Sequence, residues 1–343
     1  MKIIVISTPI FKLPVVGYSG LEHLAFLQAE GLAKLGHEVS LVAPDGSICP
    51  GVNIISMGPE KGINEKNSYK RYWPELLKAD VIIDNSWQKW SYLLKAEGRL
   101  KAPVLGVLHA PVMTMYQTLP PVEKPCFVCI SQDHANSFEA IHNREARFVY
   151  NGVDPEFYKP LDIPRTDRFL FLARFSSIKG PDIAIQACKE ADVGLDLIGD
   201  TSITNEPAYL EQCKKMADGK QIRIVGSATR GETVYWYSQA HCMIHPVKNF
   251  REPFGLAPVE SMMCQTPVIA WNNGAMRETI CPGETGLLCN TYEELVTHIR
   301  TMSKVLKPEE RLRCREWALQ FSVDKMIERY EGLCIKAIER GGW

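Results

Sequence analysis

Two basic residues of the chain, Arg174 and Lys179, have the spacing expected of counter-ions for a phosphorylated ligand. Arg174 follows the apolar run FLFLA, and Lys179 stands before Gly180 and Pro181, which are typical of a helix start. Two cations at the carboxyl end of a strand and beside a helix N-terminus can donate charge-assisted hydrogen bonds to a diphosphate. The chain holds no D-x-D carboxylate pair, so the pattern predicts that these cations, and not a divalent metal, neutralise the ligand.

Two glutamates downstream add acceptors for hydroxyl groups. Glu252 precedes a predicted helix start at about Phe254 to Leu256, and Glu260 lies on that helix two turns along. Eight residues at the helical rise span roughly 12 Å, which is close to the distance from a hexose across a diphosphate to a ribose. One extended ligand could therefore contact both acids, whereas an arbitrary pair of glutamates on a helix edge is usually only solvated.

The first half of the chain offers a third helix start, at Gly20. The loop TPIFKLPVVGYSG follows the first strand, and Ser19 with Glu22 forms an S-x-x-E sequence that predicts a capping box for a helix ended by Gly36. Because Gly20 lacks a Cβ atom, a phosphate could approach the free N–H groups of this helix. No G-x-G-x-x-G follows the first strand, which argues against a dinucleotide-binding oxidoreductase.

Short β-branched runs alternate with helical stretches along the chain, which is typical of parallel sheets with crossover helices. The pattern restarts after a proline-rich stretch at 151–167. It predicts an α/β fold of two Rossmann-like, doubly wound domains at 1–160 and 161–323, with a C-terminal helix at about 324–343 that packs back on the first domain. Such sheets bind ligands at the carboxyl ends of their strands, so we expect the site in a cleft that both domains face. The predicted strands are KIIVIS, EVSLVAP, VNIIS, DVIID, VLGVLH, CFVCIS, FLFLARF, LDLIGD, QIRIVG, HCMIHP and TPVIAW.

Composition limits the classes of function. With 45% apolar and 23% charged residues the chain can bury a large core, and its net charge of -1 gives no global field that favours nucleic acid. Eleven cysteines, an odd number without framework spacing, suit a reducing compartment, which predicts a cytoplasmic protein. The close pair Cys126 and Cys129 is interpreted as structural. The opening MKIIVIS is too short for a signal sequence or a membrane span.

The motifs of the second half closely resemble those of glycosyltransferase family 4. The pattern E-x7-E is present from Glu252 to Glu260 around PFGL, RFSSIKG at 174–180 resembles R-x4-KG, and NGVD stands at 151–154. The stretch TPVIAWNNGAMRETICPGETGLL resembles the family's G-x-PVV…GG-x-x-E…G-x-TG-L run, with Gln265 in place of a common glycine. The likeness covers nearly the whole chain and weakens at the first helix, where the family's GG-x-E appears as SGLE.

The resemblance implies the GT-B fold and a role for each matching residue. His109, at the end of the run VLGVLH, matches the family histidine that approaches the sugar. Glu252 would bind a hydroxyl of the donor sugar, and Glu260 would bind the ribose hydroxyls. The implied donor-binding positions are Gly20, Arg174, Lys179, Glu252, Phe254, Gly255, Leu256 and Glu260; the implied catalytic residues are His109, Arg174, Lys179 and Glu252.

The implied activity is the retaining transfer of a hexose from a nucleotide-diphosphate sugar, UDP-glucose or a similar one, to a hydroxyl acceptor, with no metal or other cofactor. Domain closure over the donor is expected. The aromatic residues Tyr18, Trp73 and Trp87 could stack on the acceptor or belong to the core, and the cluster from Lys70 to Trp73 allows a weak contact with a membrane surface. Two alternatives stay open: a sugar-nucleotide 2-epimerase of the same fold, and a non-catalytic nucleotide-sugar-binding protein. The acceptor and the oligomeric state are not fixed by the sequence.

Overall fold

The computed structural model describes residues 1–17, 19–61, 64–111, 122–201, 206–303 and 306–343 of the chain. Contacts divide it into two compact units. Unit 1 comprises Met1–Gly152 together with Val323–Trp343, and unit 2 comprises Val153–Ser322. Within the described ranges, no helix is both long enough and apolar enough to cross a bilayer.

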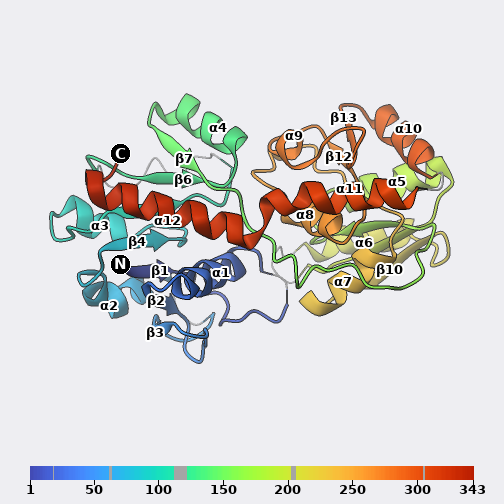
Figure 1. Ribbon diagram of the computed structural model, residues 1–343. Helices are drawn as coiled ribbons and strands as arrows, with labels where there is room; N and C mark the ends of the chain where they lie inside the picture. The colour runs from blue at the N-terminus through green and yellow to red at the C-terminus, as the bar shows by residue number, and fades with distance from the viewer. Residues whose placement is uncertain (18, 62–63, 112–121, 202–205, 304–305) are drawn as a thin grey trace. The chain divides into compact units, whose positions relative to one another are not determined.

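The described part of unit 1 is built on a parallel sheet of seven strands (Figure 1). The strand order β3-β2-β1-β4-β5-β6-β7 reverses direction beside β1, so the carboxyl ends of β1 and β4 flank a topological switch point. In the register of the sheet, Ile4 pairs with Ser40 on one side and Ile82 on the other. The strands are β1 (Lys2–Ile6), β2 (Glu38–Ala43), β3 (Asn53–Ser56), β4 (Val81–Asp84), β5 (Val104–Val107), β6 (Phe127–Cys129) and β7 (Ala146–Phe148).

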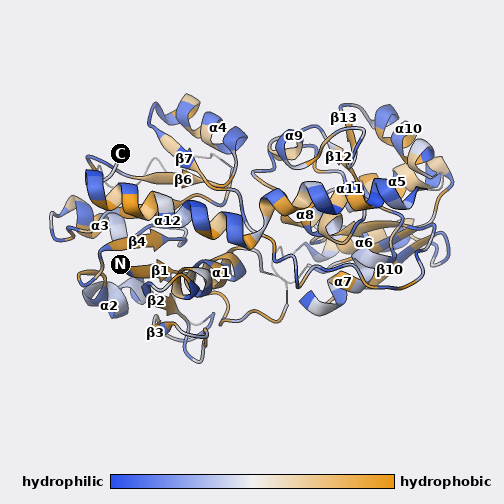
Figure 2. Ribbon diagram, in the orientation of Figure 1, coloured by the Kyte–Doolittle hydropathy of each residue, from blue (hydrophilic) through white to orange (hydrophobic). Residues whose placement is uncertain are grey.

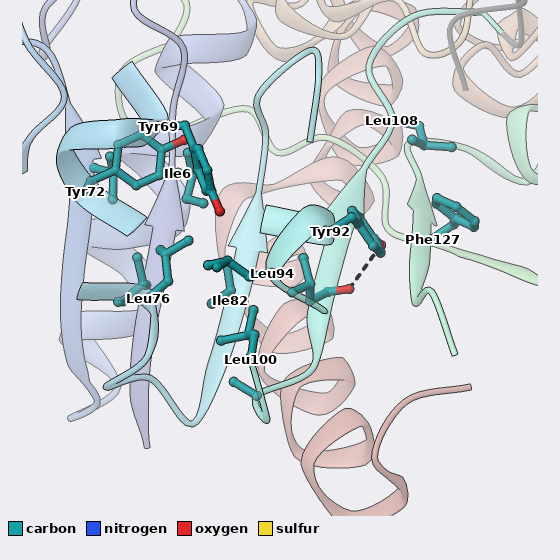
Figure 3. Packing of buried hydrophobic residues seen from close by; sticks show 14 of the residues in the cluster. Ile6, Tyr69, Tyr72, Leu76, Ile82, Tyr92, Leu94, Leu100, Leu108 and Phe127 are labelled. Carbon is teal, nitrogen blue, oxygen red and sulfur yellow. Dashed lines mark hydrogen bonds between the residues drawn. The ribbon is translucent and has the colours of Figure 1, made fainter. Parts of the chain in front are cut away.

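Helices cover both faces of the unit 1 sheet because nearly every strand residue is apolar. Side chains alternate between the faces, and one face carries Ile4, Ile6 and Ile82 in a buried cluster with residues of α2 and α3. Figure 3 shows Tyr69 and Tyr72 of α2 gathered near Ile6 in this cluster. The helices of the unit are α1 (Leu21–Lys34), α2 (Glu65–Leu76), α3 (Ser91–Ala96), α4 (Gln132–His142) and α12 (Val323–Arg340).

The C-terminal helix α12 packs along α1 in unit 1. Figure 2 shows apolar and polar bands along α12, and its buried residues include Met326, Ile327 and Tyr330. A Cβ atom on Gly31 of α1 would lie 2.4 Å from Ile327 Cγ1. Glycine at position 31 therefore lets the two helices approach each other closely.

Unit 2 repeats the same topology. Its described residues form a six-stranded parallel sheet in the order β10-β9-β8-β11-β12-β13, and its switch point lies between β8 and β11. Met243 pairs with Leu170 on one side and Val268 on the other. The strands are β8 (Phe169–Leu172), β9 (Leu195–Ile198), β10 (Ile222–Gly226), β11 (Cys242–His245), β12 (Val268–Trp271) and β13 (Gly286–Cys289).

The helices of unit 2 bury the two faces of this sheet. Phe169, Phe171 and Ile244 form one apolar cluster with Ile185 of α5 and Leu295 of α10. A 3-10 turn, Leu319–Phe321, ends the unit. The helices are α5 (Pro181–Ala191), α6 (Pro207–Met216), α7 (Arg230–Gln239), α8 (Leu256–Met263), α9 (Met276–Thr279), α10 (Tyr292–Met302) and α11 (Pro308–Ala318).

The expected fold class, two doubly wound parallel sheets, is confirmed, and each predicted strand is present. Two short strands, β7 and β13, were not predicted. The predicted capping box of α1 is wrong. The N-cap is Gly20, which makes no side-chain hydrogen bond, while the Ser19 hydroxyl donates to the Glu22 carboxylate. The Ser19 hydroxyl therefore binds the buried Glu22 carboxylate and does not cap the backbone of the helix.

Candidate active site

The centre of the candidate site in unit 2 is a buried ion pair between Lys179 and Glu252. Lys179 lies in the loop between β8 and α5, and Glu252 lies in the loop between β11 and α8. These two strands flank the switch point, which is why residues 73 positions apart meet there. Lys179 Nζ donates to Glu252 Oε2 over 2.5 Å, and the two side chains are 12% and 9% exposed.

His245, the last residue of β11, is a third member of this cluster that the sequence interpretation missed. Its Nε2 atom lies 3.4 Å from Glu252 Oε2, farther than the Lys179 ammonium, and its side chain is buried beside the pair. Burial lowers the pKa of His245 although Glu252 opposes this effect. A strand-end histidine in the run HCMIHP is the same signal that selected His109, and it could have selected His245.

Glu252 is held in its ionised form. Burial alone would raise the pKa of its carboxyl, but the Lys179 ammonium and then His245 outweigh burial and hold the pKa well below its ordinary value of 4.5. A carboxylate that stays charged is a strong hydrogen-bond acceptor. The pair thus places one fixed anion and one fixed cation at the carboxyl edge of the sheet.

This depressed pKa predicts a pH dependence of stability. Glu252 of the unfolded chain takes up its proton near the ordinary pKa of 4.5, before the folded protein does, so its stabilising contribution is present at neutral pH and is lost as pH falls. We expect the thermal stability of the wild type, measured relative to Glu252→Gln, to decline between about pH 6 and pH 3. Thermal unfolding midpoints of both proteins across this range measure the effect.

Lys179→Met supplies the control for that measurement. Without the ammonium, only His245 opposes the effect of burial on the pKa of Glu252, so the pKa rises. The stability difference between Lys179→Met and the double variant Lys179→Met/Glu252→Gln should then no longer decline as pH falls, or should change in the opposite direction. Equal pH slopes in the two backgrounds would show that the pair does not lower the pKa of Glu252.

Glu260, in the middle of α8, is the second acidic residue of the site. The Tyr237 hydroxyl on α7 donates to its Oε2 atom over 3.0 Å, and Arg230 Nη2 lies 3.9 Å from its Oε1 atom. Burial, with Glu260 next, raises the pKa of Tyr237 well above its ordinary value, so the hydroxyl stays protonated and donates. Arg230 is in turn held over the Tyr158 ring at 5.6 Å. Tyr237 and Arg230 were missed because neither belongs to a recognisable motif.

The predicted helix start at about Phe254 to Leu256, with Glu252 before it, is confirmed, but the helical rise does not apply to all eight residues between the two glutamates, so the estimate of about 12 Å does not follow. The helix α8 begins at Leu256, so only the second half of the E-x7-E pattern is helical, and Glu252 sits in the preceding loop. The loop brings Glu252 to Lys179, while the helix carries Glu260 to Tyr237. The two acids are therefore positioned by different elements.

The two helices that follow the loops of Lys179 and Glu252 have glycine at the N-cap. Gly180 caps α5 and Gly255 caps α8, both with positive φ angles of 68° and 84°, and neither makes a side-chain cap hydrogen bond. By contrast, the N-caps of α7 and α10 are Thr229 and Thr291, whose hydroxyls accept from the helix backbone. The first N–H groups of α5 and α8 thus have no side-chain acceptor from the N-cap and can face an anion.

The remaining predicted donor-site positions of unit 2 lie on the same two loops. Arg174 follows β8 by two residues, and Leu256 opens α8. The Phe254 side chain is 1% exposed and packs edge-on against Phe321, with ring centroids 5.8 Å apart. Only the backbone of Phe254 is therefore available to a ligand.

Gly274 lies directly against the backbone of Glu252. Its φ is +61°, and a Cβ atom there would lie 2.2 Å from the backbone oxygen of Glu252. The neighbouring amide of Ala275 donates to that same oxygen over 2.9 Å. The loop before α9 can thus hold the backbone of Glu252 only because residue 274 has no side chain.

Replacing Gly274 by alanine tests this contact. Both Gly274→Ala and the control Gly219→Ala put alanine at positive φ, a strain of about 1–2 kcal/mol, but a Cβ atom on Gly219 meets nothing within 4 Å. We expect Gly274→Ala to cost about 1–3 kcal/mol more, as an overpacked contact does. Its thermal midpoint should fall by about 2–4 °C per kcal/mol, and similar midpoints for the two variants would refute the contact.

In unit 1, the predicted residue Gly20 starts α1 beside a buried carboxylate. The Thr8 and Ser19 hydroxyls both donate to Glu22, which is 5% exposed. This arrangement fixes the loop after β1 to the first turn of α1. As the N-cap, Gly20 offers no side-chain acceptor to the first N–H groups of α1. The predicted contact of these groups with an anion stays a prediction.

His109 lies two residues beyond β5 in unit 1, at the carboxyl edge of the sheet. Its Nε2 atom is 2.8 Å from Asn85 Oδ1, and Asn85 directly follows β4. Burial, then the nearby Lys89 and His134, lowers the pKa of His109 well below its ordinary value. The imidazole is therefore neutral at neutral pH.

The aromatic residues predicted for the acceptor lie on different elements of unit 1. Trp73, on α2, packs against the core cluster, and Arg99 lies over its ring at 4.5 Å. Trp87 follows β4, and its backbone N–H donates to Glu65 Oε1 over 2.7 Å. Tyr18 lies outside the described residues. The arrangement favours a core role for Trp73 and leaves Trp87 as the better candidate for a ligand contact.

The part of the chain that the structure describes contains no group of three or more His, Cys, Asp or Glu side chains that could hold a metal ion. Metal-independent chemistry stays a prediction.

Two family models match the chain. The model described as "Glycosyl transferases group 1" matches residues 155–320, and the model described as "Glycosyltransferase Family 4" matches residues 18–157. An uncharacterized glycosyltransferase of Methanocaldococcus jannaschii is 30% identical over 162 residues, which are 47% of this chain and 44% of that protein. A D-inositol 3-phosphate glycosyltransferase of Catenulispora acidiphila is 28% identical over 221 residues, 56% of this chain and 52% of the relative. The chain thus spans about half the length of these relatives.

Solved structures share the fold over nearly their full length. The sucrose-phosphate synthase of Thermosynechococcus elongatus superposes with a TM-score of 0.78 at 19% identity, covering 98% of this chain and 99% of that one. HepE of Anabaena, crystallised with UDP-glucose, gives a TM-score of 0.77 at 18% identity, covering 98% and 100%. Since the two matched models together run from residue 18 to residue 320 and the E-x7-E acids lie within them, the chain belongs to glycosyltransferase family 4.

Proposed function

We propose that this protein is a retaining hexosyltransferase, which moves a hexose from a nucleotide-diphosphate sugar to a hydroxyl group of an acceptor without a metal. The observation that carries the proposal is the buried pair of Lys179 and Glu252 at the switch point of unit 2, with the held carboxylate of Glu260 on the adjoining helix. An ammonium, a charged carboxylate and a second acid match a ligand that is anionic in its middle and carries hydroxyl groups at both ends.

Each group of unit 2 has a distinct role in this proposal. Lys179 and Arg174 neutralise the diphosphate, and their effect grows as negative charge develops on the departing phosphate oxygen. Glu252 accepts a hydrogen bond from a hydroxyl of the hexose, and Glu260 accepts from the ribose hydroxyls. The uncapped N–H groups at the start of α8, next to Gly255, attract the phosphate and the sugar.

In the proposed reaction the acceptor attacks the anomeric carbon on the face that the nucleotide leaves. The acceptor oxygen forms the new glycosidic bond, the bond from the anomeric carbon to the phosphate oxygen breaks, and the acceptor proton passes to the departing diphosphate. The anomeric configuration is retained as a result. In unit 1, His109 accepts a hydrogen bond from a ligand hydroxyl, and Gly20 leaves room for a phosphate at the start of α1.

The choice of substrates to test follows from the relatives. UDP-glucose is bound by the Anabaena structure, so UDP-glucose is the first donor in our proposal. D-inositol 3-phosphate is named in several relatives, so phosphorylated polyols are the first acceptors to examine. All eleven cysteines are free and all but Cys281 are buried, which suits the proposed cytoplasmic location.

A thermal-shift screen of UDP, GDP and ADP sugars, followed by a transfer assay, tests the proposal. We expect one nucleotide series to raise the unfolding midpoint, and its sugar to be transferred with release of free nucleoside diphosphate only when an acceptor is present. A sugar-nucleotide 2-epimerase would instead return an isomerised sugar on the same nucleotide. Binding without release of sugar or nucleotide over hours would indicate a non-catalytic binding protein.

A further inference from the structure

A chain of buried amides reaches from helix α1 to His109 in unit 1. Asn85 is 0% exposed and Gln28 is 1% exposed. The Asn85 Nδ2 atom donates to Gln28 Oε1 over 2.8 Å, while Asn85 Oδ1 lies 2.8 Å from His109 Nε2. The backbone N–H of Asn85 donates to the oxygen of Ile6 on β1, over 2.9 Å. Asn85 is therefore fixed by the sheet on one side and by α1 on the other.

These hydrogen bonds between Gln28, Asn85 and His109 determine which ring nitrogen of His109 carries the hydrogen. The Asn85 side chain uses its only donor group on Gln28, so the group facing His109 is a carbonyl oxygen, which can only accept. His109 Nε2 must then donate. In a neutral imidazole the other nitrogen, Nδ1, is left with a free electron pair and is an acceptor.

The charged groups around this loop favour the neutral ring. Lys89 and His134 both act against a second proton on His109. The nearby carboxylates are engaged elsewhere: Asp84 accepts from the Ser86 and Ser91 hydroxyls, and Glu65 accepts from the backbone N–H groups of the loop after β4. Neither carboxylate replaces Asn85 as the partner of the imidazole.

We propose that Asn85 is a positioning residue, which holds His109 in the tautomer with hydrogen on Nε2 and so presents Nδ1 as an acceptor for a hydroxyl group of a ligand bound to unit 1. The inference rests on the proposed function, in which His109 contacts a ligand hydroxyl. Asn85 itself touches no reacting atom. Its effect is to decide whether His109 accepts or donates.

The tautomer can be read without any activity. In protein labelled with 15N histidine, long-range 1H–15N spectra distinguish a protonated ring nitrogen from a bare one, and a His109→Gln sample identifies the signal among the eight histidines. We expect hydrogen on Nε2 and a bare Nδ1 in the wild type. Hydrogen on Nδ1 would mean that Asn85 presents its amide nitrogen, and not its oxygen, to His109. This result would overturn the proposal even if the protein proves to be an active transferase.

Variants of Asn85 test the functional consequence. Asn85→Asp keeps an acceptor for Nε2, and Gln28 can turn to donate to it, but the new anion raises the pKa of His109 and favours a second proton on Nδ1. Because of its raised pKa, the ring of this variant takes up a second proton at a higher pH than the wild-type ring does. The value of kcat/KM for this variant should therefore fall as pH drops from 8 to 6, while that of the wild type stays constant. Asn85→Ala has no acceptor for His109 Nε2, so its kcat/KM should be about tenfold lower than that of the wild type. This loss should be the same at pH 6 and at pH 8.

Asn53→Asp, the same substitution at a surface position on β3, is the matched control and should keep the wild-type profile. An Asn85→Asp profile that coincides with that of Asn53→Asp would overturn the proposal, as would an unchanged kcat/KM in Asn85→Ala. If the wild type transfers no sugar at all, the proposed function fails, and the tautomer measured by NMR still decides the role of Asn85.

Discussion

Replacing Lys179 by alanine is expected to lower kcat about 10²- to 10³-fold while changing the donor KM by only a few fold. In the proposed reaction the negative charge on the departing diphosphate grows toward the transition state, so a buried ammonium stabilises the transition state more than the bound donor. Lys179 is suited to this effect because its side chain is only 12% exposed and is fixed by Glu252. Initial rates against donor concentration separate the two constants.

Lys189→Ala is the control for Lys179→Ala. Lys189 is exposed in the last turn of α5, the helix that follows Lys179, and we expect no change in either constant. The loss of the ammonium also leaves the buried Glu252 carboxylate without its main partner, so the folded state of the variant is checked by its thermal midpoint. A stable Lys179→Ala protein with undiminished turnover would contradict the role of Lys179 in charge stabilisation.

The sheets could be predicted from the sequence because their central strands are buried on both faces. Runs such as KIIVIS and VIID are largely apolar and β-branched without alternation, which is the signature of a covered parallel strand. The strand β7 was missed because it has only three residues, including Arg147, and β13 because GLLC follows a glycine-rich turn. Short edge strands depend on pairing with a neighbour, which local sequence does not contain.

Sequence motifs selected individual residues of the candidate site but not the contacts between them. Arg174, Lys179 and Glu252 were selected by motif and by their places at strand ends, yet the ion pair between Lys179 and Glu252 joins two loops that meet only after the strand order is known. His245 and Asn85 were missed for a related reason. A single histidine or asparagine is usually structural, and only the fold shows that these two contact Glu252 and His109.

Replacing Glu260 by alanine is expected to weaken the binding of the nucleoside diphosphate roughly 100-fold, which corresponds to about 3 kcal/mol from two charge-assisted hydrogen bonds to the ribose. The Tyr237 hydroxyl orients this carboxylate through its hydrogen bond to Oε2, so Tyr237→Phe should weaken binding in the same direction but only about three- to tenfold. Isothermal titration with the nucleotide that the thermal-shift screen selects measures both losses.

A cycle with deoxyribose nucleotides isolates the contact of Glu260 with the ribose. In the wild type, removal of the hydroxyl that Glu260 binds should weaken binding about tenfold or more, while in Glu260→Ala the same removal should matter little because its partner is already absent. Glu211→Gln, at an exposed position on α6, should bind both nucleotides like the wild type. Strictly additive losses in the cycle would show that the ribose hydroxyls are bound elsewhere, and the carboxylate on α8 would then serve only to hold Tyr237 and Arg230 in place.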